Sequence, residues 1–428
     1  MDIKKNKLKL IFDVTLLKYA LKPSGLRNGV FFVTLNVLKQ LLGRSDVDLA
    51  LTCNPPDFYC VKHILNREIP GVDCCFKVDE SKISNFFSKL KYLKKSTSWE
   101  SKGYKKALFR ILEAIFFPFF KLSSFIMSKH DFHEYDAFLS PAYLISDRVV
   151  SKKYIILHDL IPLILPEYKE NWKSGKWLYD LCATLNHDDH YFTNSEYTRR
   201  DFLKYYPQID SEKIKTTLLA CDEKFKPNPS GVEKVKEKYG IPKDMKYVFS
   251  LCTLEPRKNL QRTVKTFVEF LKKNNISDTV FVLGGGHWKS FIDSLAGIIG
   301  GFGDYKDKII KIGYVDDEDL PALYSGAEWF TYTSMYEGFG LPPLEAMSCG
   351  CPVIVSNNSS LPEVVGDAGI LIDWDSDQQH IEAYEKYYFN PQLRKMNREK
   401  GLARAEEFSW AKCVNTMVET MKRDCGLS

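Results

Sequence analysis

The sequence contains no apolar run long enough to cross a membrane as a helix. Its longest apolar block, Ala114 to Phe120, falls well short of the ~20 residues that a spanning helix needs, and it contains Pro118. The basic start, MDIKKNKLKLIFDV, has too short an apolar segment for a signal peptide and predicts a first β-strand instead. We therefore expect a cytoplasmic protein without a transmembrane helix.

Cysteine patterns that build disulfide frameworks or zinc sites are also missing. The 11 cysteines are scattered, and several lie inside expected strands or beside turns, as Cys252, Cys349 and Cys351 do. We expect reduced thiols that pack as small apolar groups.

The chain as a whole has no strong excess of charge of one sign. Its 60 Lys and Arg residues are nearly balanced by 55 Asp and Glu residues, for a net charge of +5. The overall composition therefore indicates no nucleic-acid partner.

One segment, about residues 82–130, departs from this balance. Between Lys82 and Lys129 it interleaves basic and aromatic side chains, and its acidic residues are only Glu100 and Glu113. This mixture suits contact with an anionic membrane surface. It equally fits a helical insertion that packs on its own domain with its lysines in water, and single-stranded nucleic acid is a weaker third option.

What the chain does have is a regular alternation of strand-like and helix-like segments. Short apolar runs ending in polar turns predict buried strands at 8–13, 47–51, 135–139, 154–157, 191–193, 247–252, 279–283, 309–312, 329–332, 353–355 and 370–372. Helical patterns lie between several of them, at 30–42, 197–205, 260–272 and 317–324. This order predicts an α/β protein with two Rossmann-like, doubly wound domains that face each other across a cleft.

A turn-rich junction at Thr216–Pro229 separates the two units. It begins with a short expected strand, TTLLA, and continues as CDEKFKPNPSG. We predict an N-terminal domain over residues 1–218, which carries the basic insertion, and a C-terminal domain over residues 219–407.

The most informative feature is Glu337–Glu345, which reads EGFGLPPLE. It follows an apolar, aromatic run and precedes a helix-like segment at Leu344–Ser348. A Gly-rich turn before a helix presents free N–H groups and the positive end of the helix dipole, which suits a phosphate. Two carboxylates beside it suit the hydroxyls of sugars and riboses. The combination predicts a nucleotide-sugar site.

Two adjacent cations, Arg257 and Lys258, follow the strand at 247–252 in the segment TLEPRKNL. The carboxyl end of a parallel strand is where ligands bind, and this pair suits a diphosphate. Asn259 is a candidate N-cap for the next helix. Cations at a helix start oppose its dipole, so a bound anion explains them better than a solvated charge pair does.

Two features of the first half are placed to face this site. Gly25 lies in a Gly-containing loop after the first strand, where backbone N–H groups could reach a diphosphate, although such a loop alone is a weak signal. His158 ends a strand and is followed by Asp159 and a turn. A functional histidine and a structural one that hydrogen-bonds within the turn both fit this position.

Three other clusters predict no special chemistry. His187–His190 cannot converge on one metal, because adjacent residues of a strand alternate faces. Asp373–Asp375 has the D-x-D spacing of metal-dependent sugar transferases, but turn and capping roles account for it. Gly284–Gly286 indicates a tight turn and not a P-loop, since no Gly-Lys-Ser/Thr follows.

Together these segments resemble the family 4 retaining glycosyltransferases, which have the GT-B fold. The resemblance is strongest over Tyr247–Asp373, through TLEPRKN, IGYV and SMYEGFGLPPLEAMSCGCPVIVSNNSSLPEVVGDAGILID. PSGLRNG, HDLIPL and NSEYTRRD in the first half are similar more loosely, and only the basic insertion has no counterpart. The family implies that a C-terminal helix, within 408–428, crosses back to the N-terminal domain.

The resemblance also implies a role for each site residue. Glu337 and His158 would act at the reacting sugar, and Glu345 would hold the ribose hydroxyls. The other donor-binding residues that the family implies surround the diphosphate and the base: Gly25, Arg257, Lys258, Tyr314, Val315, Gly338, Phe339, Gly340 and Leu341.

The implied activity is a glycosyl transfer from a nucleotide-diphosphate sugar, with no cofactor and no metal. Fixed cations and N–H dipoles would stabilise the leaving diphosphate. The motif variants resemble bacterial mannosyl- and rhamnosyltransferases of surface polysaccharide and O-antigen assembly. This implies GDP-mannose as donor and a lipid-linked glycan as acceptor, at the inner face of the cytoplasmic membrane. A nucleotide-sugar epimerase, or a catalytically silent protein that binds sugars or partners, is the alternative.

Overall fold

The computed structural model describes residues 7–21, 29–71, 75–78, 85–86, 88–89, 91–92, 132–141, 152–165, 175–253, 255–285 and 289–427. Gly25, Leu254, Gly286 and most of the basic insertion lie outside these residues.

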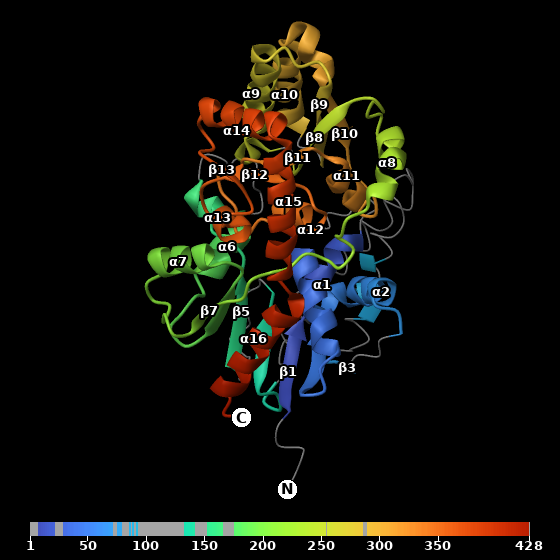
Figure 1. Cartoon of the computed structure of the whole chain (residues 1–428). Coiled ribbons are helices and arrows are strands. Elements are labelled where there is room, and N and C mark those ends of the chain that lie inside the picture. The colour runs from blue at the N-terminus through green and yellow to red at the C-terminus, as the bar shows by residue number, and fades with distance from the viewer. Residues whose placement is uncertain are drawn as a thin grey trace.

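The first domain is built on a parallel sheet with the strand order β3-β2-β1-β4-β5-β6-β7 (Figure 1). The strands are β1 (Leu8–Asp13), β2 (Val47–Thr52), β3 (Cys75–Phe76), β4 (Ala137–Ser140), β5 (Lys152–Leu157), β6 (His190–Thr193) and β7 (Ile214–Thr216). The helices around them are α1 (Gly29–Leu42), α2 (Phe58–Glu68), α5 (Ile161–Ile164), α6 (Gly175–Cys182) and α7 (Glu196–Tyr205).

The second domain has a parallel sheet with the order β10-β9-β8-β11-β12-β13. Its strands are β8 (Lys246–Leu251), β9 (Thr279–Gly284), β10 (Ile309–Gly313), β11 (Trp329–Tyr332), β12 (Val353–Ser356) and β13 (Gly369–Ile372). Its helices are α8 (Val232–Lys238), α9 (Leu260–Lys273), α10 (Lys289–Gly300), α11 (Leu320–Gly326), α12 (Leu341–Ser348), α13 (Leu361–Val365), α14 (Asp377–Phe389) and α15 (Pro391–Glu406).

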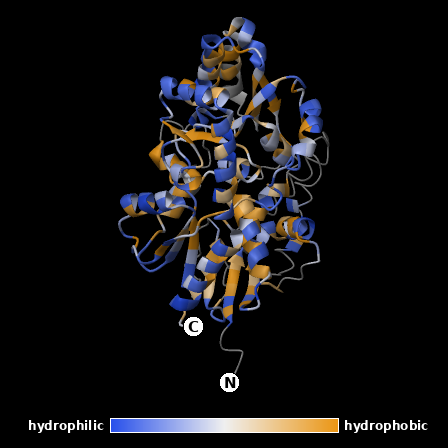
Figure 2. Ribbon diagram, in the orientation of Figure 1, coloured by the Kyte–Doolittle hydropathy of each residue, from blue (hydrophilic) through white to orange (hydrophobic). Residues whose placement is uncertain are grey.

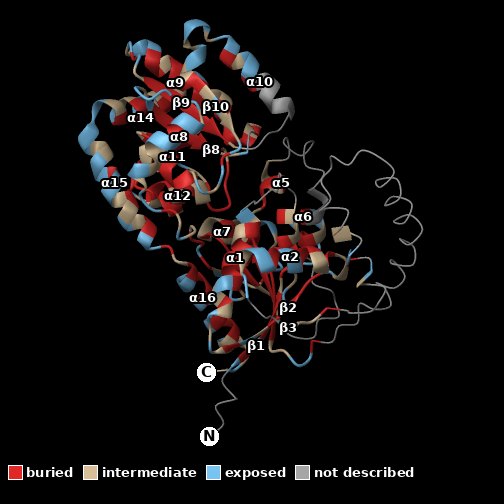
Figure 3. Cartoon of the chain, turned by 90° about the vertical axis from the view of Figure 1, so that its right-hand side faces the viewer, coloured by how far each residue is buried: buried red, intermediate tan, exposed pale blue. Residues whose placement is uncertain are grey.

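The strands are nearly continuous apolar runs, visible as hydrophobic bands in Figure 2. Figure 3 shows why: helices cover the sheets, and the buried residues gather along the strands and the inner helix faces. The two predicted doubly wound sheets are thus confirmed.

The strand expected in TTLLA ends earlier than predicted. β7 stops at Thr216, and Thr217 donates its N–H to the carbonyl of Thr193 as the last ladder bond, at 2.7 Å. Leu218 is already exposed, because the chain here leaves the sheet and crosses toward the second domain.

The predicted crossing helix is present as α16 (Trp410–Asp424), which follows α15 after a short break. It packs on α1 and β1 of the first domain (Figure 1). Its apolar face is buried through Val414, Met417, Val418 and Met421. At its end, Lys422 Nζ lies 2.6 Å from a carboxylate oxygen of Asp46. The C-terminal helix therefore completes the core of the N-terminal domain.

The few described residues of the basic insertion lie against α2. Lys91 Nζ is 2.7 Å from Asp57 Oδ1, and Ser88 Oγ accepts the N–H of Tyr59 at 2.9 Å. No helix within the described ranges is both long and apolar enough to cross a membrane.

Shortening Met417 to alanine should destabilise the whole N-terminal domain. Met417 is fully buried, so Met417→Ala leaves a cavity that typically costs about 2–5 kcal/mol. Urea unfolding measures the loss. Thr416→Ala, on the exposed side of the same helix, is the control. Equal stability of the two variants would contradict this packing.

Candidate functional site

Charged residues gather where β8 and β11 end at the carboxyl edge of the second sheet. Arg257 and Lys258 lie in the 3-10 turn Pro256–Lys258 after β8, and Glu337 lies in the loop between β11 and α12. Because β8 and β11 are neighbours, residues about 80 positions apart meet there.

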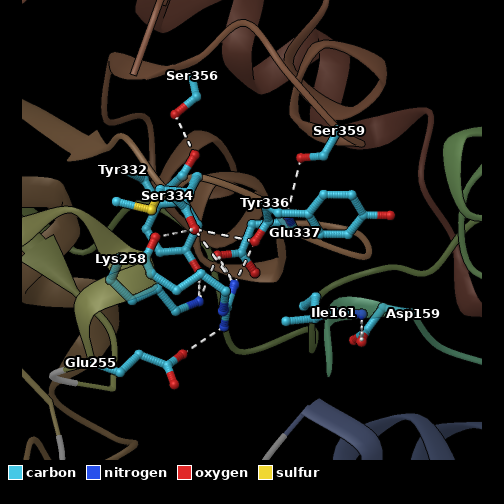
Figure 4. A network of polar contacts seen from close by, with 12 residues as sticks. Asp159, Ile161, Glu255, Lys258, Tyr332, Ser334, Tyr336, Glu337, Ser356 and Ser359 are labelled. Atoms are coloured by element: carbon cyan, nitrogen blue, oxygen red, sulfur yellow. Dashed lines mark hydrogen bonds and ion pairs between the residues drawn. The ribbon is translucent and has the colours of Figure 1, made fainter. Parts of the chain in front are cut away.

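Both predicted cations contact the predicted carboxylate directly. Glu337 Oε1 lies 3.0 Å from Arg257 Nη1 and 2.6 Å from Lys258 Nζ. Lys258 also donates to the hydroxyl of Tyr332 at 2.7 Å, and Arg257 Nη2 donates to Glu255 Oε1 at 2.6 Å. Figure 4 shows Glu255, Lys258 and Tyr332 with Glu337 in one network of polar contacts. This Glu255 contact was not predicted from the sequence.

The cluster stays charged although it is buried. Burial alone would raise the pKa of Glu337, but the charges of Arg257 and Lys258 lower that pKa to about 2. Burial opposes the charge of Arg257, while Glu337 and Glu255 raise its pKa. Paired charges of this kind persist in an interior, whereas a single one would not.

Serine side chains hold the loop that carries Glu337. Ser359 Oγ accepts the N–H of Glu337 at 3.0 Å, and Ser360 Oγ donates to the carbonyl of Glu337, also at 3.0 Å. Ser356 Oγ donates to the carbonyl of Ser334 at 2.7 Å. These serines belong to the SNNSS turn after β12, whose role the sequence analysis missed. A serine-rich turn at the same sheet edge was the available signal.

The turn after Glu337 has unused N–H groups. Within the described residues, no hydrogen bond uses the backbone N–H of Gly338, Phe339 or Gly340. Gly340 has a positive φ of 115° and stands at the N-cap of α12, which begins at Leu341. Free N–H groups at a helix start suit an anion, so an anion site at this turn stays a prediction.

At Gly338 the second domain lies close against the first. A Cβ there would lie 2.5 Å from the carbonyl oxygen of His158 and 2.9 Å from Asp159 Cβ. The HDLIPL segment of the first domain therefore faces the Glu337 loop. Asp159 Oδ1 accepts the N–H of Ile161, the first residue of α5, at 3.0 Å (Figure 4).

Several known proteins are similar in sequence to this chain. The family described as glycosyl transferases group 1 matches residues 231–404. The O-antigen chain mannosyltransferase B of Escherichia coli is 33% identical over 267 residues, which cover 62% of this chain and 68% of that protein. The chain belongs to the group 1 glycosyl transferases.

Two further proteins are similar to this chain, each over a different share of its length. The glycosyltransferase is 28% identical to the serotype-specific mannosyltransferase WbdA of Escherichia coli over 66% of this chain but only 35% of that larger protein. It superposes on HepE of Anabaena, solved in complex with UDP and glucose, with a TM-score of 0.67 and 16% identity. That match covers 97% of this chain and all of HepE. The predicted GT-B fold is thereby confirmed.

Glu345 of the glycosyltransferase lies on α12, apart from the ion cluster. Its Oε2 accepts the hydroxyl of Tyr324 at 3.0 Å. Burial raises the pKa of Glu345, and the Tyr324 hydrogen bond lowers it only partly, so the pKa is about 7. The two predicted carboxylates thus have opposite electrostatic environments.

His158 is half-buried and neutral at pH 7. Burial lowers the pKa of His158 to about 4, against the hydrogen bond of its Nε2 with the carbonyl of Pro141 at 2.7 Å. A carbonyl only accepts, so Nε2 carries the proton and Nδ1 is an acceptor.

The two residues predicted to line the base differ in their exposure. Tyr314 is 59% exposed, whereas Val315 is buried beside Gly284. Gly25 lies outside the described residues. Gly29, the first residue of α1, lies close to α12, because a Cβ on Gly29 would be 3.7 Å from Leu341 Cδ1.

The predicted N-cap Asn259 and one of the clusters expected to be structural contact residues far away in the sequence. Asn259 occupies the N-cap of α9 with a positive φ of 57°, but its side chain donates to the carbonyl of Trp374 instead of capping the helix. His190 Nδ1 lies 3.1 Å from Asp424 Oδ2, on the crossing helix. Among the described residues, no group of three or more His, Cys, Asp and Glu side chains could hold a metal ion.

Glu345 should make stability depend on pH around neutrality. Its pKa is 4.5 in the reference state and about 7 in the fold, so the folded chain binds more protons. The stability that Glu345 contributes is therefore fully present below pH 4.5 and is lost as the pH rises through 7. As the pH rises from 4.5 through 7, the unfolding free energy of Glu345→Gln should increase relative to that of the wild type, by no more than about 3 kcal/mol.

Urea unfolding at several pH values between 4.5 and 8 measures this difference. The exposed residue Glu212, changed to Gln, is the control. Parallel curves for Glu345→Gln and the wild type would show that Glu345 does not titrate in this range.

Proposed function

We propose that the chain is a retaining, metal-independent glycosyltransferase that moves mannose from GDP-mannose to a lipid-linked glycan in O-antigen assembly. The observation that carries this proposal is the cluster of Arg257, Lys258 and Glu337 beside the free N–H groups of Gly338–Gly340. The relatives named above as O-antigen and serotype-specific mannosyltransferases support the choice of sugar.

In this proposal the residues divide the charge that develops during the reaction. Breaking the bond between sugar and phosphate leaves negative charge on the diphosphate and positive charge on the sugar. The two cations and the N–H groups of the α12 turn stabilise the diphosphate, which makes a metal unnecessary. Glu337 fixes the sugar hydroxyls and faces the positive charge.

His158 and Glu345 bind hydroxyl groups of the donor. The free Nδ1 of neutral His158 accepts a hydrogen bond from the sugar, and Glu345 accepts from the ribose. The base lies against the exposed ring of Tyr314, next to Val315. Gly25, outside the described residues, is assigned to the diphosphate. No side chain is assigned as a nucleophile.

In this proposal the acceptor binds to the first domain, which carries the basic insertion. We propose that the protein works at the inner face of the cytoplasmic membrane and that residues 82–130 contact its anionic lipids. A lipid-linked acceptor would be presented there.

Removing either partner of the central ion pair should abolish turnover. Glu337→Ala and Lys258→Ala should each lower the transfer rate by on the order of a hundredfold or more. Because an unpaired buried charge can also unfold the chain, Glu337→Gln serves as a milder second variant. Lys386→Ala, an exposed lysine on α14, is the control. Full activity of folded Glu337→Gln or Lys258→Ala would overturn the site assignment.

The base can be identified by thermal shift with GDP, UDP and dTDP. A nucleotide that binds only the folded chain raises its melting temperature, so GDP should give the largest shift. A larger shift with UDP or dTDP would replace GDP-mannose as the donor, and no shift with any of them would favour a silent binding protein. Turnover of the sugar nucleotide to an isomer without acceptor would indicate an epimerase.

A further inference from the structure

The loop that carries Glu337 is held from the other domain. Tyr336, which precedes Glu337, donates its hydroxyl to Asp201 Oδ2 on α7. The ring of Tyr336 also meets the ring of Tyr197 edge to face, with centroids 5.9 Å apart. Tyr336 therefore ties the catalytic loop of the second domain to a helix of the first.

The residue after Glu337 is tied to the same helix. The carbonyl of Gly338 accepts from Ser195 Oγ at 2.8 Å and from Thr198 Oγ1 at 3.1 Å. Ser195 and Thr198 are fully buried, so water does not compete for these bonds. Glu337 thus lies between two residues that α7 holds.

The second domain grips α7 in return. Glu363, on α13, accepts the N–H of Glu196 at 2.9 Å and that of Tyr197 at 3.3 Å. A carboxylate at a helix N-terminus is favoured by the free N–H groups and the helix dipole. These contacts, together with those of Ser195, Thr198 and Asp201, form an interdomain clasp around the start of α7.

We propose that α7 is the positioning element for Glu337. The clasp sets this carboxylate opposite His158 and Asp159 by holding both of its neighbours in the chain, so Asp201, Ser195 and Thr198 act through the loop and need not touch the donor. The proposal rests on the role given to Glu337 under the proposed function. A displacement of about 1 Å in a catalytic group can cost a hundredfold in rate.

Loss of the clasp should have an effect on kinetics that differs from the effect of general destabilisation. Arg257, Lys258 and Glu345 all belong to the second domain, and within the described residues none of their side chains bonds to α7, so most of the proposed nucleotide contacts do not require α7. Loss of the clasp should therefore lower kcat and leave the dissociation constant of the nucleoside diphosphate nearly unchanged.

The decisive variants are Tyr336→Phe and Asp201→Ala, alone and together. Each single variant should lower kcat for the sugar nucleotide by about tenfold or more. The double variant should be no slower than the slower single one, because both changes break one bond. Asp201→Asn, whose amide oxygen still accepts from Tyr336, should restore part of the rate. Tyr205→Phe, on the exposed side of α7, is the matched control.

Calorimetry with the nucleoside diphosphate selected by the thermal-shift panel supplies the second measurement. Wild-type kcat in Tyr336→Phe, additive losses in the double variant, or an equal loss of nucleotide affinity would each overturn the clasp. Glu337→Gln separates this failure from that of the proposed function. An inactive Glu337→Gln with a fully active Tyr336→Phe rejects only the clasp, whereas an active Glu337→Gln rejects the function itself.

Discussion

The pairing of Glu337 with Arg257 and Lys258 is the contact around which the carboxyl edge of the second sheet is arranged. Three charges lie there with only about a tenth of each side chain exposed. Each is tolerable because the others are present, and removing one from such a group typically costs about 3–5 kcal/mol. The tyrosine, serine and glutamate contacts around them keep the charges in place.

The order of the strands brings these charges together. Parallel pairing places the ends of β8 and β11 side by side, although the segments that follow them are far apart in sequence. The same rule places the HDLIPL segment of the first domain against the Glu337 loop, where Gly338 leaves no room for a side chain. A change of strand order would keep every motif and lose the site.

Much of this was accessible from the sequence because the signals are local. Apolar runs located the strands, and the EGFGLPPLE turn and the Arg257–Lys258 pair marked the two halves of the cluster. The direct bond between Glu337 and these cations was not foreseen, since spacing along a chain does not give distances between side chains. Asn259 stands at its predicted cap position, but a partner more than a hundred residues away captured its amide. The Tyr336–Asp201 bond and the serine contacts were missed for the same reason: their partners meet only in the folded chain.

The way α16 packs has a consequence for the order in which the protein can fold. Helix α1 packs against α16, which lies several hundred residues later in the chain. During synthesis from the N-terminus, the first sheet emerges long before Trp410–Asp424 does. The apolar surface that α16 covers therefore stays exposed until the second domain has been synthesised, and during that time it can bind chaperones or misassemble. The N-terminal domain is translated before the second domain, yet it is completed after it.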